Sequence, residues 1–144
     1  MKTIRLIVPA LVLLLSLFGS GCATMSSNSA PGTDLSKVKR VYVVHLPADK
    51  RGINQIIADQ LNLLGFQATT GEASSVPSDV DATLTYQDKW MWDITMYMIE
   101  LNVQLRQPKT EMSLATARSY RPSLQRKSPP EMVKEVVTEL FKKK

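Results

Sequence analysis

Alternating apolar and polar positions over residues 81–120 predict three consecutive antiparallel strands. In residues 82–92 the apolar side chains fall on one parity, as a strand buried on one face requires. In residues 97–105 they fall on the opposite parity. Because a two-residue period cannot change phase inside one regular strand, a turn or bulge is expected within residues 91–95, and the two strands form a hairpin.

A second chain reversal is predicted at Gln107 to Thr110. Pro108 supplies a turn conformation there and cannot donate a hydrogen bond to a sheet ladder. Residues 113–120 then return as a third strand, with the small residues Ala115 and Ala117 on one face. The sequence therefore predicts a three-stranded meander.

The segment before the meander predicts a strand, a helix and a second strand. The continuous run from Val41 to Val44 is typical of a strand covered on both faces, and apolar residues at helical spacing follow it. Asp49 suits the N-cap of this helix, and Gly65 suits its left-handed C-terminal end. The predicted elements are a strand at 38–46, a helix at 53–64, a strand at 66–70 and a loop at 71–80.

A final helix is predicted after Ser128. This serine is followed by Pro129 and, three positions on, by Glu131, which together form a capping box with proline at the first helical position. One apolar stripe follows, formed by Met132, Val133, Val136, Val137, Leu140 and Phe141. The helix is expected to pack on the sheet.

This order of elements predicts an α+β domain over residues 38–144. Strand, helix, strand, meander and helix form two layers: a mixed sheet of about five strands, in the order β-α-β-β-β-α, with two helices on one face. At 144 residues the chain is long enough for one such domain and a leader.

The N-terminus has the composition of a signal peptide over residues 1–21. Lys2 and Arg5 precede an apolar run from Leu6 to Phe18. That run is shorter than the about 20 residues that a membrane-spanning helix needs. Cys22, the only cysteine of the chain, follows directly.

Gly19, Ser20, Gly21 and Cys22 resemble the lipobox of a bacterial lipoprotein precursor. The resemblance implies cleavage before Cys22 by signal peptidase II and acylation of Cys22 on sulfur and nitrogen. Gly19 departs from the leucine usual at its position, and an ordinary secretory signal with a chance cysteine is the alternative. Several acyl chains would make a lasting membrane anchor.

Residues 22–37 are expected to form the lipidated cysteine and a flexible tether, because residues 23–37 are small and polar and contain Pro31 and Gly32. In lipoproteins of the enteric type, an Asp just after the cysteine retains the protein in the inner membrane. Ala23 and Thr24 stand there instead. The resemblance therefore implies an outer-membrane location facing the periplasm.

Charge and residue chemistry give little support to nucleic-acid binding or catalysis. The net charge is +5, and Lys2 and Arg5 belong to the predicted signal peptide. His45 is the only histidine, so a histidine triad or a multi-histidine metal site cannot form. Asp88 and Asp93 could act as paired carboxylates for glycan hydrolysis, but Asp near a hairpin turn more often stabilises the turn. No enzyme activity, cofactor, metal or nucleic acid is expected.

Two groups of residues are candidates for binding. The first is an apolar cluster at the predicted hairpin, which either closes the core or forms a partner surface: Trp90, Trp92, Met96 and Met98. The second leads into the final helix and either binds an anion or is a solvated basic loop: Arg118, Arg121, Arg126 and Lys127.

The strand of residues 99–106, the turn after it and the strand of residues 113–120 resemble small envelope lipoproteins and accessory domains of the TolB N-terminal, LpoB and CsgG type. Thr110 matches their turn, whereas the Asp and Gly common there are absent. The resemblance implies a non-catalytic accessory module of an envelope protein assembly. The alternatives are binding or hydrolysis of peptidoglycan or lipid headgroups, and a purely structural envelope lipoprotein.

Overall fold

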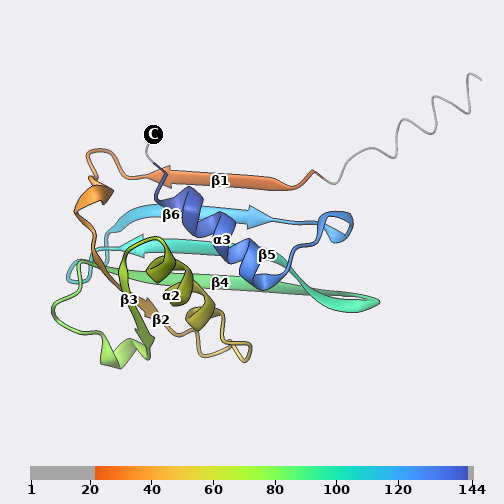
Figure 1. Ribbon diagram of the computed structural model, residues 1–144, viewed down its shortest axis with the longest axis horizontal. Coiled ribbons are helices and arrows are strands. Elements are labelled where there is room, and N and C mark those ends of the chain that lie inside the picture. Colours follow the sequence, from red (N-terminus) through yellow and green to blue (C-terminus); the bar gives the residue numbers. More distant parts are fainter. Residues whose placement is uncertain (1–21, 143–144) are drawn as a thin grey trace, which may run out of the picture.

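A computed structural model describes residues 22–142 and shows one open sheet of six strands with two helices packed on the same face (Figure 1). The strands lie in the order β1-β6-β5-β4-β2-β3. They are β1 (Thr24–Ser29), β2 (Arg40–Val44), β3 (Gln67–Gly71), β4 (Ala82–Asp93), β5 (Thr95–Arg106) and β6 (Ser113–Tyr120). The helices are α2 (Ile53–Leu63) and α3 (Pro129–Leu140), and single 3-10 turns are η1 (Leu35–Lys37), η2 (Ala73–Ser75) and η3 (Ser123–Gln125). The mixed α+β class is confirmed, with one strand more than expected.

The meander of β4, β5 and β6 follows the alternation of the sequence. β4 and β5 pair antiparallel and reverse at Ile94, and their register shifts between Lys89 and Trp90. The predicted change of phase is therefore real, and it combines a bulge with a turn. β6 pairs antiparallel with β5 over the residues predicted for it.

The β2-α2-β3 unit forms the parallel part of the sheet. β2 pairs in parallel with β3 on one side and with β4 on the other. α2 begins at Ile53, as predicted, but Gly52 rather than Asp49 takes the N-cap position, with a left-handed φ of 71°. Asp49 still caps the helix from four residues before Ile53: its carboxylate accepts the backbone N–H of Ile53 at 2.7 Å.

The sixth strand is β1, from the segment predicted to be part of a flexible tether. β1 pairs antiparallel with β6 from Thr24 to Ser29. Its residues are all small or polar except Met25, so the alternation of an ordinary strand is missing. The tether prediction is wrong for these residues, and Ala23 alone separates Cys22 from the sheet. The predicted signal peptide lies outside the described residues.

The core lies between the helices and one face of the sheet. The predicted stripe of α3 is buried up to Leu140, and α2 contributes three large residues, Ile53, Ile57 and Leu61. The sheet contributes Val41, Val43, Ala82, Leu84, Tyr86, Leu101, Val103, Leu105, Ala115 and Ala117. The start of α3 has the expected cap, because the Glu131 carboxylate accepts the backbone N–H of Ser128 at 2.8 Å.

Candidate functional site

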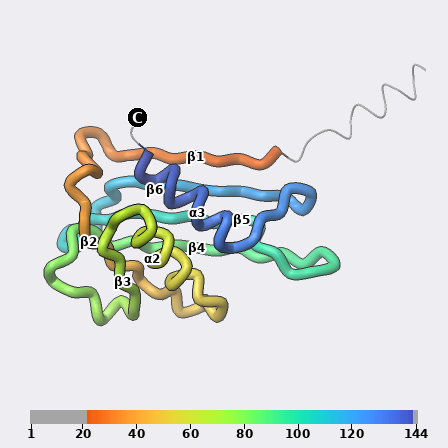
Figure 2. The backbone as a smooth tube through the Cα atoms, in the orientation of Figure 1, coloured from red at the N-terminus to blue at the C-terminus, as the bar shows by residue number. Residues whose placement is uncertain are grey.

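The β4–β5 hairpin extends beyond the rest of the sheet. Pairing places Thr24, Tyr120, Glu100 and Lys89 at one level across four strands. Beyond this level the hairpin continues to Ile94, about five residues or roughly 15 Å of strand. Figure 2 shows this overhang at the end of the sheet where β1 begins.

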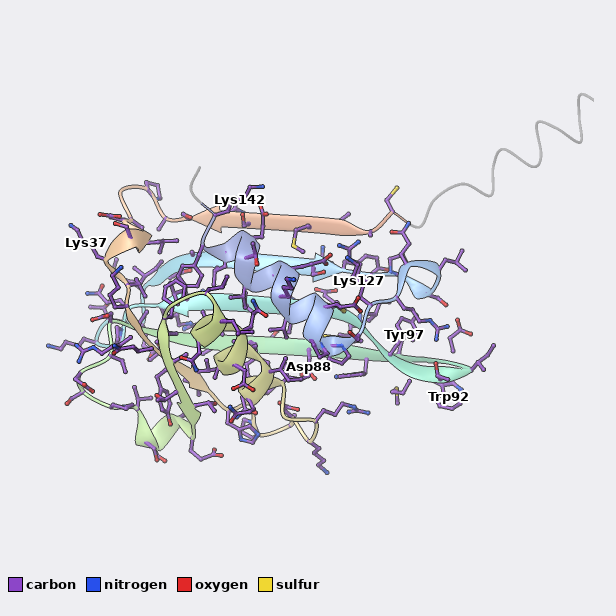
Figure 3. All side chains as sticks on the ribbon, viewed as in Figure 1. Lys37, Asp88, Trp92, Tyr97, Lys127 and Lys142 are labelled. Carbon is purple, nitrogen blue, oxygen red and sulfur yellow. The ribbon has the colours of Figure 1, made fainter. Side chains whose placement is uncertain are left out.

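The structure divides the four apolar residues predicted for partner binding into two pairs. Met98 is 1% exposed, and Trp90 is half-buried against the core with the Arg51 guanidinium 4.2 Å above its ring. Trp92 is 69% exposed, and Met96, its neighbour across the hairpin, is half exposed. Trp90 and Trp92 share a parity, but only Trp90 reaches the core, because Trp92 lies farther out on the overhang (Figure 3).

Three further apolar residues at this end of the molecule lie outside the four partner-binding candidates. Ile94 is 86% exposed at the tip, and Leu124 in η3 is 98% exposed. Met91 is partly exposed on the hairpin. Ile94 also has a φ of 63°, a conformation that is strained for a β-branched residue. The sequence signal for this exposed residue was Ile94 itself, because it falls within the turn or bulge predicted for residues 91–95.

Cys22 lies at the same end as these side chains. It is exposed and precedes β1 by two residues. The backbone N–H of Ala23 donates to the Gln125 side chain at 3.2 Å, which places the start of the fold beside Leu124. We define the hairpin end as the exposed apolar residues Met91, Trp92, Ile94, Met96 and Leu124.

The predicted basic residues are paired with carboxylates of the same chain. Arg121 donates to Glu135 at 2.7 Å, and Lys127 bonds to the same carboxylate. Arg118 lies on the sheet face opposite the helices and donates to Glu100 at 2.8 Å. The four residues therefore do not converge on one anion-sized site.

Arg126 ties η3 to the hairpin. Its guanidinium donates to the Thr95 hydroxyl at 2.9 Å, to the Asp93 carboxylate at 3.0 Å and to the Ser123 carbonyl at 2.9 Å. It also stacks 4.4 Å from the centre of the Tyr97 ring. We call these contacts the Arg126 latch. Asp93 therefore belongs to this latch, and Asp88 accepts a hydrogen bond from the Trp90 indole N–H.

Arg126→Ala is expected to lower the free energy of unfolding by about 1 kcal/mol and to expose the hairpin to proteolysis, because a planar guanidinium joins two segments here. Urea denaturation and limited proteolysis measure the two effects. Arg126→Lys is the matched control: it keeps the charge but not the fork, so it should resemble the alanine variant. Wild-type protease resistance in both variants would contradict the latch.

The sheet face opposite the helices is open over β4, β5, β6 and β1. Polar side chains line a shallow depression of about 640 Å³ there. They include hydroxyls, amides and guanidinium groups, from Ser26, Asn28, Thr85, Gln87, Asn102, Gln104, Arg106, Thr116 and Arg118. The alternation of these strands accounts for this face, because their residues that face away from the core are mostly polar, Leu114 being an exception.

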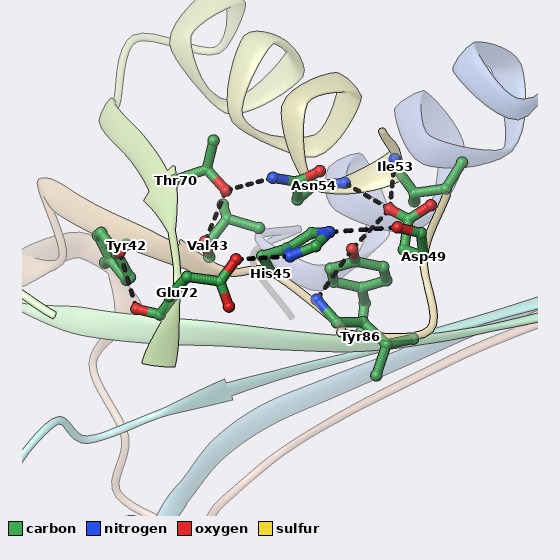
Figure 4. Close-up of polar contacts among 10 residues, drawn as sticks. Tyr42, Val43, His45, Asp49, Ile53, Asn54, Thr70, Glu72 and Tyr86 are labelled. Carbon is green, nitrogen blue, oxygen red and sulfur yellow. Dashed lines mark hydrogen bonds and ion pairs between the residues drawn. The ribbon is translucent and has the colours of Figure 1, made fainter. Parts of the chain in front are cut away.

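His45 lies at the end of β2 in a network of polar groups (Figure 4). Its Nδ1 is 2.9 Å from the Glu72 carboxylate, and its Nε2 is 3.2 Å from the Asp49 carbonyl oxygen. Both partners are acceptors, and only the imidazolium has two N–H donors. The hydrogen bond with Glu72 and then that with Asp49 raise the pKa of His45 against the effect of partial burial.

This raised pKa predicts a pH-dependent contribution to stability. The imidazolium contacts stabilise the fold fully below the unfolded pKa of about 6.5, and this contribution is lost as the pH rises through the folded pKa. Thermal unfolding of wild type and His45→Gln from about pH 5 to pH 9 measures it. The melting temperature of the wild type should exceed that of His45→Gln at low pH, and this difference should shrink as the pH rises. The Glu72→Gln substitution should also make the difference smaller. Parallel pH profiles would contradict the prediction.

Neither helix in the described part of the chain is long and apolar enough to cross a membrane. Within residues 22–142, no group of three or more His, Cys, Asp or Glu side chains is arranged to hold a metal ion.

Solved structures are similar to this chain at low sequence identity, and those with a TM-score above 0.5 share its fold. A PelC dodecamer from Paraburkholderia phytofirmans is 13% identical with a TM-score of 0.61, and the match covers 85% of this chain and 100% of that one. A PDZ domain protein from Parabacteroides distasonis is 9% identical with a TM-score of 0.55, covering 85% and 37%. TolB from Acinetobacter baumannii is 17% identical with a TM-score of 0.47, covering 83% and 31%. No protein-family model and no curated protein matches the chain.

Proposed function

We propose that this chain is an outer-membrane lipoprotein and a non-catalytic accessory module, which binds a protein of the bacterial envelope through the open face of its sheet. The observation that carries the proposal is the polar depression on that face, which no helix covers. Its hydroxyl, amide and guanidinium groups offer both donors and acceptors to a partner surface. The helices occupy the other face, so a bound partner need not displace the core.

The resemblance of residues 19–22 to a lipobox supports the membrane-anchored part of the proposal. Cys22 is exposed and lies at the edge of the fold, so its sulfur is accessible for acylation. Because only Ala23 lies between Cys22 and β1, the anchor holds the folded domain directly at the membrane. The partner is therefore an envelope component within reach of that membrane.

A second copy of the chain is one candidate for the partner. The PelC structure that shares the fold over its whole length is a dodecamer. Among the strands of residues 22–142, β1 and β3 lie at the two sheet edges, each with one side unpaired, and such edges can pair with another chain. Self-association is a form of the proposed binding function, and a crosslinking experiment separates it from binding to another protein.

Photo-crosslinking in cells tests the proposal. A photoreactive residue at Gln104, on the open face, is expected to trap one discrete protein, which mass spectrometry identifies as another envelope protein or a second copy. The same residue at Lys134, which lies on the solvent side of α3, is the control and should trap no discrete partner. Absence of a protein adduct at Gln104, or the same adducts at both positions, would contradict binding through this face.

A further inference from the structure

We propose that the hairpin end is a membrane-docking surface that enters the headgroup region of a phospholipid bilayer beside Cys22. The inference goes beyond the accessory function proposed above and uses its lipid anchor only to fix which membrane is near. The proposal rests on where the exposed apolar residues lie, on their chemistry and on the strain at Ile94.

The exposed large apolar side chains gather at one end of the molecule. Of the eight among the described residues, five form the hairpin end. The other three are elsewhere: Leu63 and Leu64 at the end of α2, and Met112 in the turn between β5 and β6. The start of β1, two residues after Cys22, lies at the same end as the tip of the β4–β5 hairpin (Figure 1). A lipid on Cys22 would therefore bring these five side chains to the bilayer surface.

The side chains of the hairpin end suit the interface of a bilayer. Trp92 and Met96 are neighbours across the two strands, and Ile94 projects at the tip between them. Tryptophan is enriched at membrane interfaces because its ring is apolar while its N–H can bond to water or headgroups. Lys89 and Arg51 are exposed and lie behind the tip, where positive charge favours acidic headgroups.

The hairpin end is held in shape without a partner. The Arg126 latch fixes the strands of the hairpin to η3, and the bond between Ala23 and Gln125 fixes η3 to the start of β1. Hydrogen bonds therefore link the hairpin tip, η3 and the start of β1. A preformed apolar end loses little conformational freedom on docking, which favours binding.

Ile94 is the residue whose choice folding alone does not explain. A hairpin turn with positive φ is more stable with Asn or Gly. Isoleucine instead adds exposed apolar surface at the residue where the hairpin reverses. Contact with lipid acyl chains would stabilise that side chain, because it removes the surface from water.

Fluorescence quenching tests the docking. The full chain carries Trp90→Phe, so that Trp92 is its only tryptophan, and is isolated from bacterial membranes. It is then reconstituted into vesicles of phosphatidylethanolamine and phosphatidylglycerol. These vesicles also contain lipids that are brominated on their acyl chains and quench nearby tryptophan. Trp92 emission is expected to shift to shorter wavelength and to lose most of its intensity. The control carries Trp90→Phe, Trp92→Phe and Met112→Trp, which moves the probe to the opposite end of the sheet, where no quenching is expected. Equal quenching at both positions overturns the proposal.

A second variant separates insertion from mere proximity. Ile94→Asp in the background with Trp92 alone keeps the latch residues but places a charge at the tip, so quenching should fall sharply. Unchanged quenching in this variant also overturns the proposal.

Mass spectrometry of the Cys22 peptide from the same preparation tests the lipid anchor independently. An acylated Cys22 with unquenched Trp92 refutes docking and leaves the anchor intact. An unmodified Cys22 with quenched Trp92 supports docking and refutes the anchor. The two proposals therefore fail by different results.

Discussion

Replacing Asp49 with alanine is expected to lower the free energy of unfolding by about 3 kcal/mol, because one buried carboxylate joins three parts of the fold. Asp49 is 7% exposed. Its carboxylate accepts the backbone N–H groups of Arg51 and Ile53 and the Tyr86 hydroxyl, each at 2.7 Å. Alanine leaves the start of α2 and a buried hydroxyl of β4 without this acceptor.

Asp59→Ala is the matched control for this prediction. Asp59 lies on α2, the helix that Asp49 caps, but is exposed, and its carboxylate accepts one hydrogen bond from the Gln55 side chain. Its replacement should change the free energy of unfolding by less than about 0.5 kcal/mol. Tyr86→Phe removes one of the Asp49 contacts and should cost about 1 kcal/mol. Urea denaturation of the three variants measures their free energies of unfolding. Similar decreases for Asp49→Ala and Asp59→Ala would contradict the prediction.

The pKa of Asp49 adds a pH dependence to the same contacts. Burial on its own would raise this pKa, but the hydrogen bonds from Arg51, Tyr86, Ile53 and Asn54 outweigh it, so the pKa lies below its ordinary value. A lowered folded pKa means that the carboxylate stabilises the fold above the unfolded pKa of about 3.9, and that this contribution is lost as the pH falls through the folded pKa. Burial and the hydrogen bond to Asp49 raise the pKa of Tyr86.

The sequence predicts those parts of the fold whose pattern reflects burial. β6 and the cap of α3 appear where expected, because alternation and the Ser128 to Glu131 spacing arise from local geometry. β1 could not be predicted in this way. An edge strand of small polar residues has no buried face of its own to impose a pattern, and its place depends on pairing with β6.

The candidate site could also be predicted only in part, because it depends on contacts between elements that are distant in the sequence. The apolar cluster of the hairpin is visible in the sequence, but its division into core and surface depends on where the helices stop covering the sheet. Trp90 lies within reach of the core and Trp92 beyond it, although both have the same parity. The partners of the basic residues are also invisible in the sequence, because Arg121 and Glu135 meet only once α3 packs on the sheet.

Ile94→Asn is expected to raise the free energy of unfolding by about 1 kcal/mol, because asparagine tolerates the left-handed backbone that isoleucine resists. The φ of 63° at Ile94 is the source of the strain. Met96→Asn is the matched control: it also replaces an exposed apolar side chain on the hairpin, but in the extended backbone of β5, so no gain is expected. Urea denaturation of the purified protein measures both variants.

The same Ile94→Asn substitution should weaken quenching of Trp92 by brominated lipids, so that stability and membrane docking change in opposite directions. If Ile94 were retained for folding, its replacement would lower both stability and membrane docking, because it would harm the structure that positions Trp92. A gain in stability with a loss of docking is the result expected when a strained residue is kept for the surface it offers. If Ile94→Asn destabilises the fold, the strain argument fails, and the docking surface then rests on the position and chemistry of Trp92, Met96 and Leu124 alone.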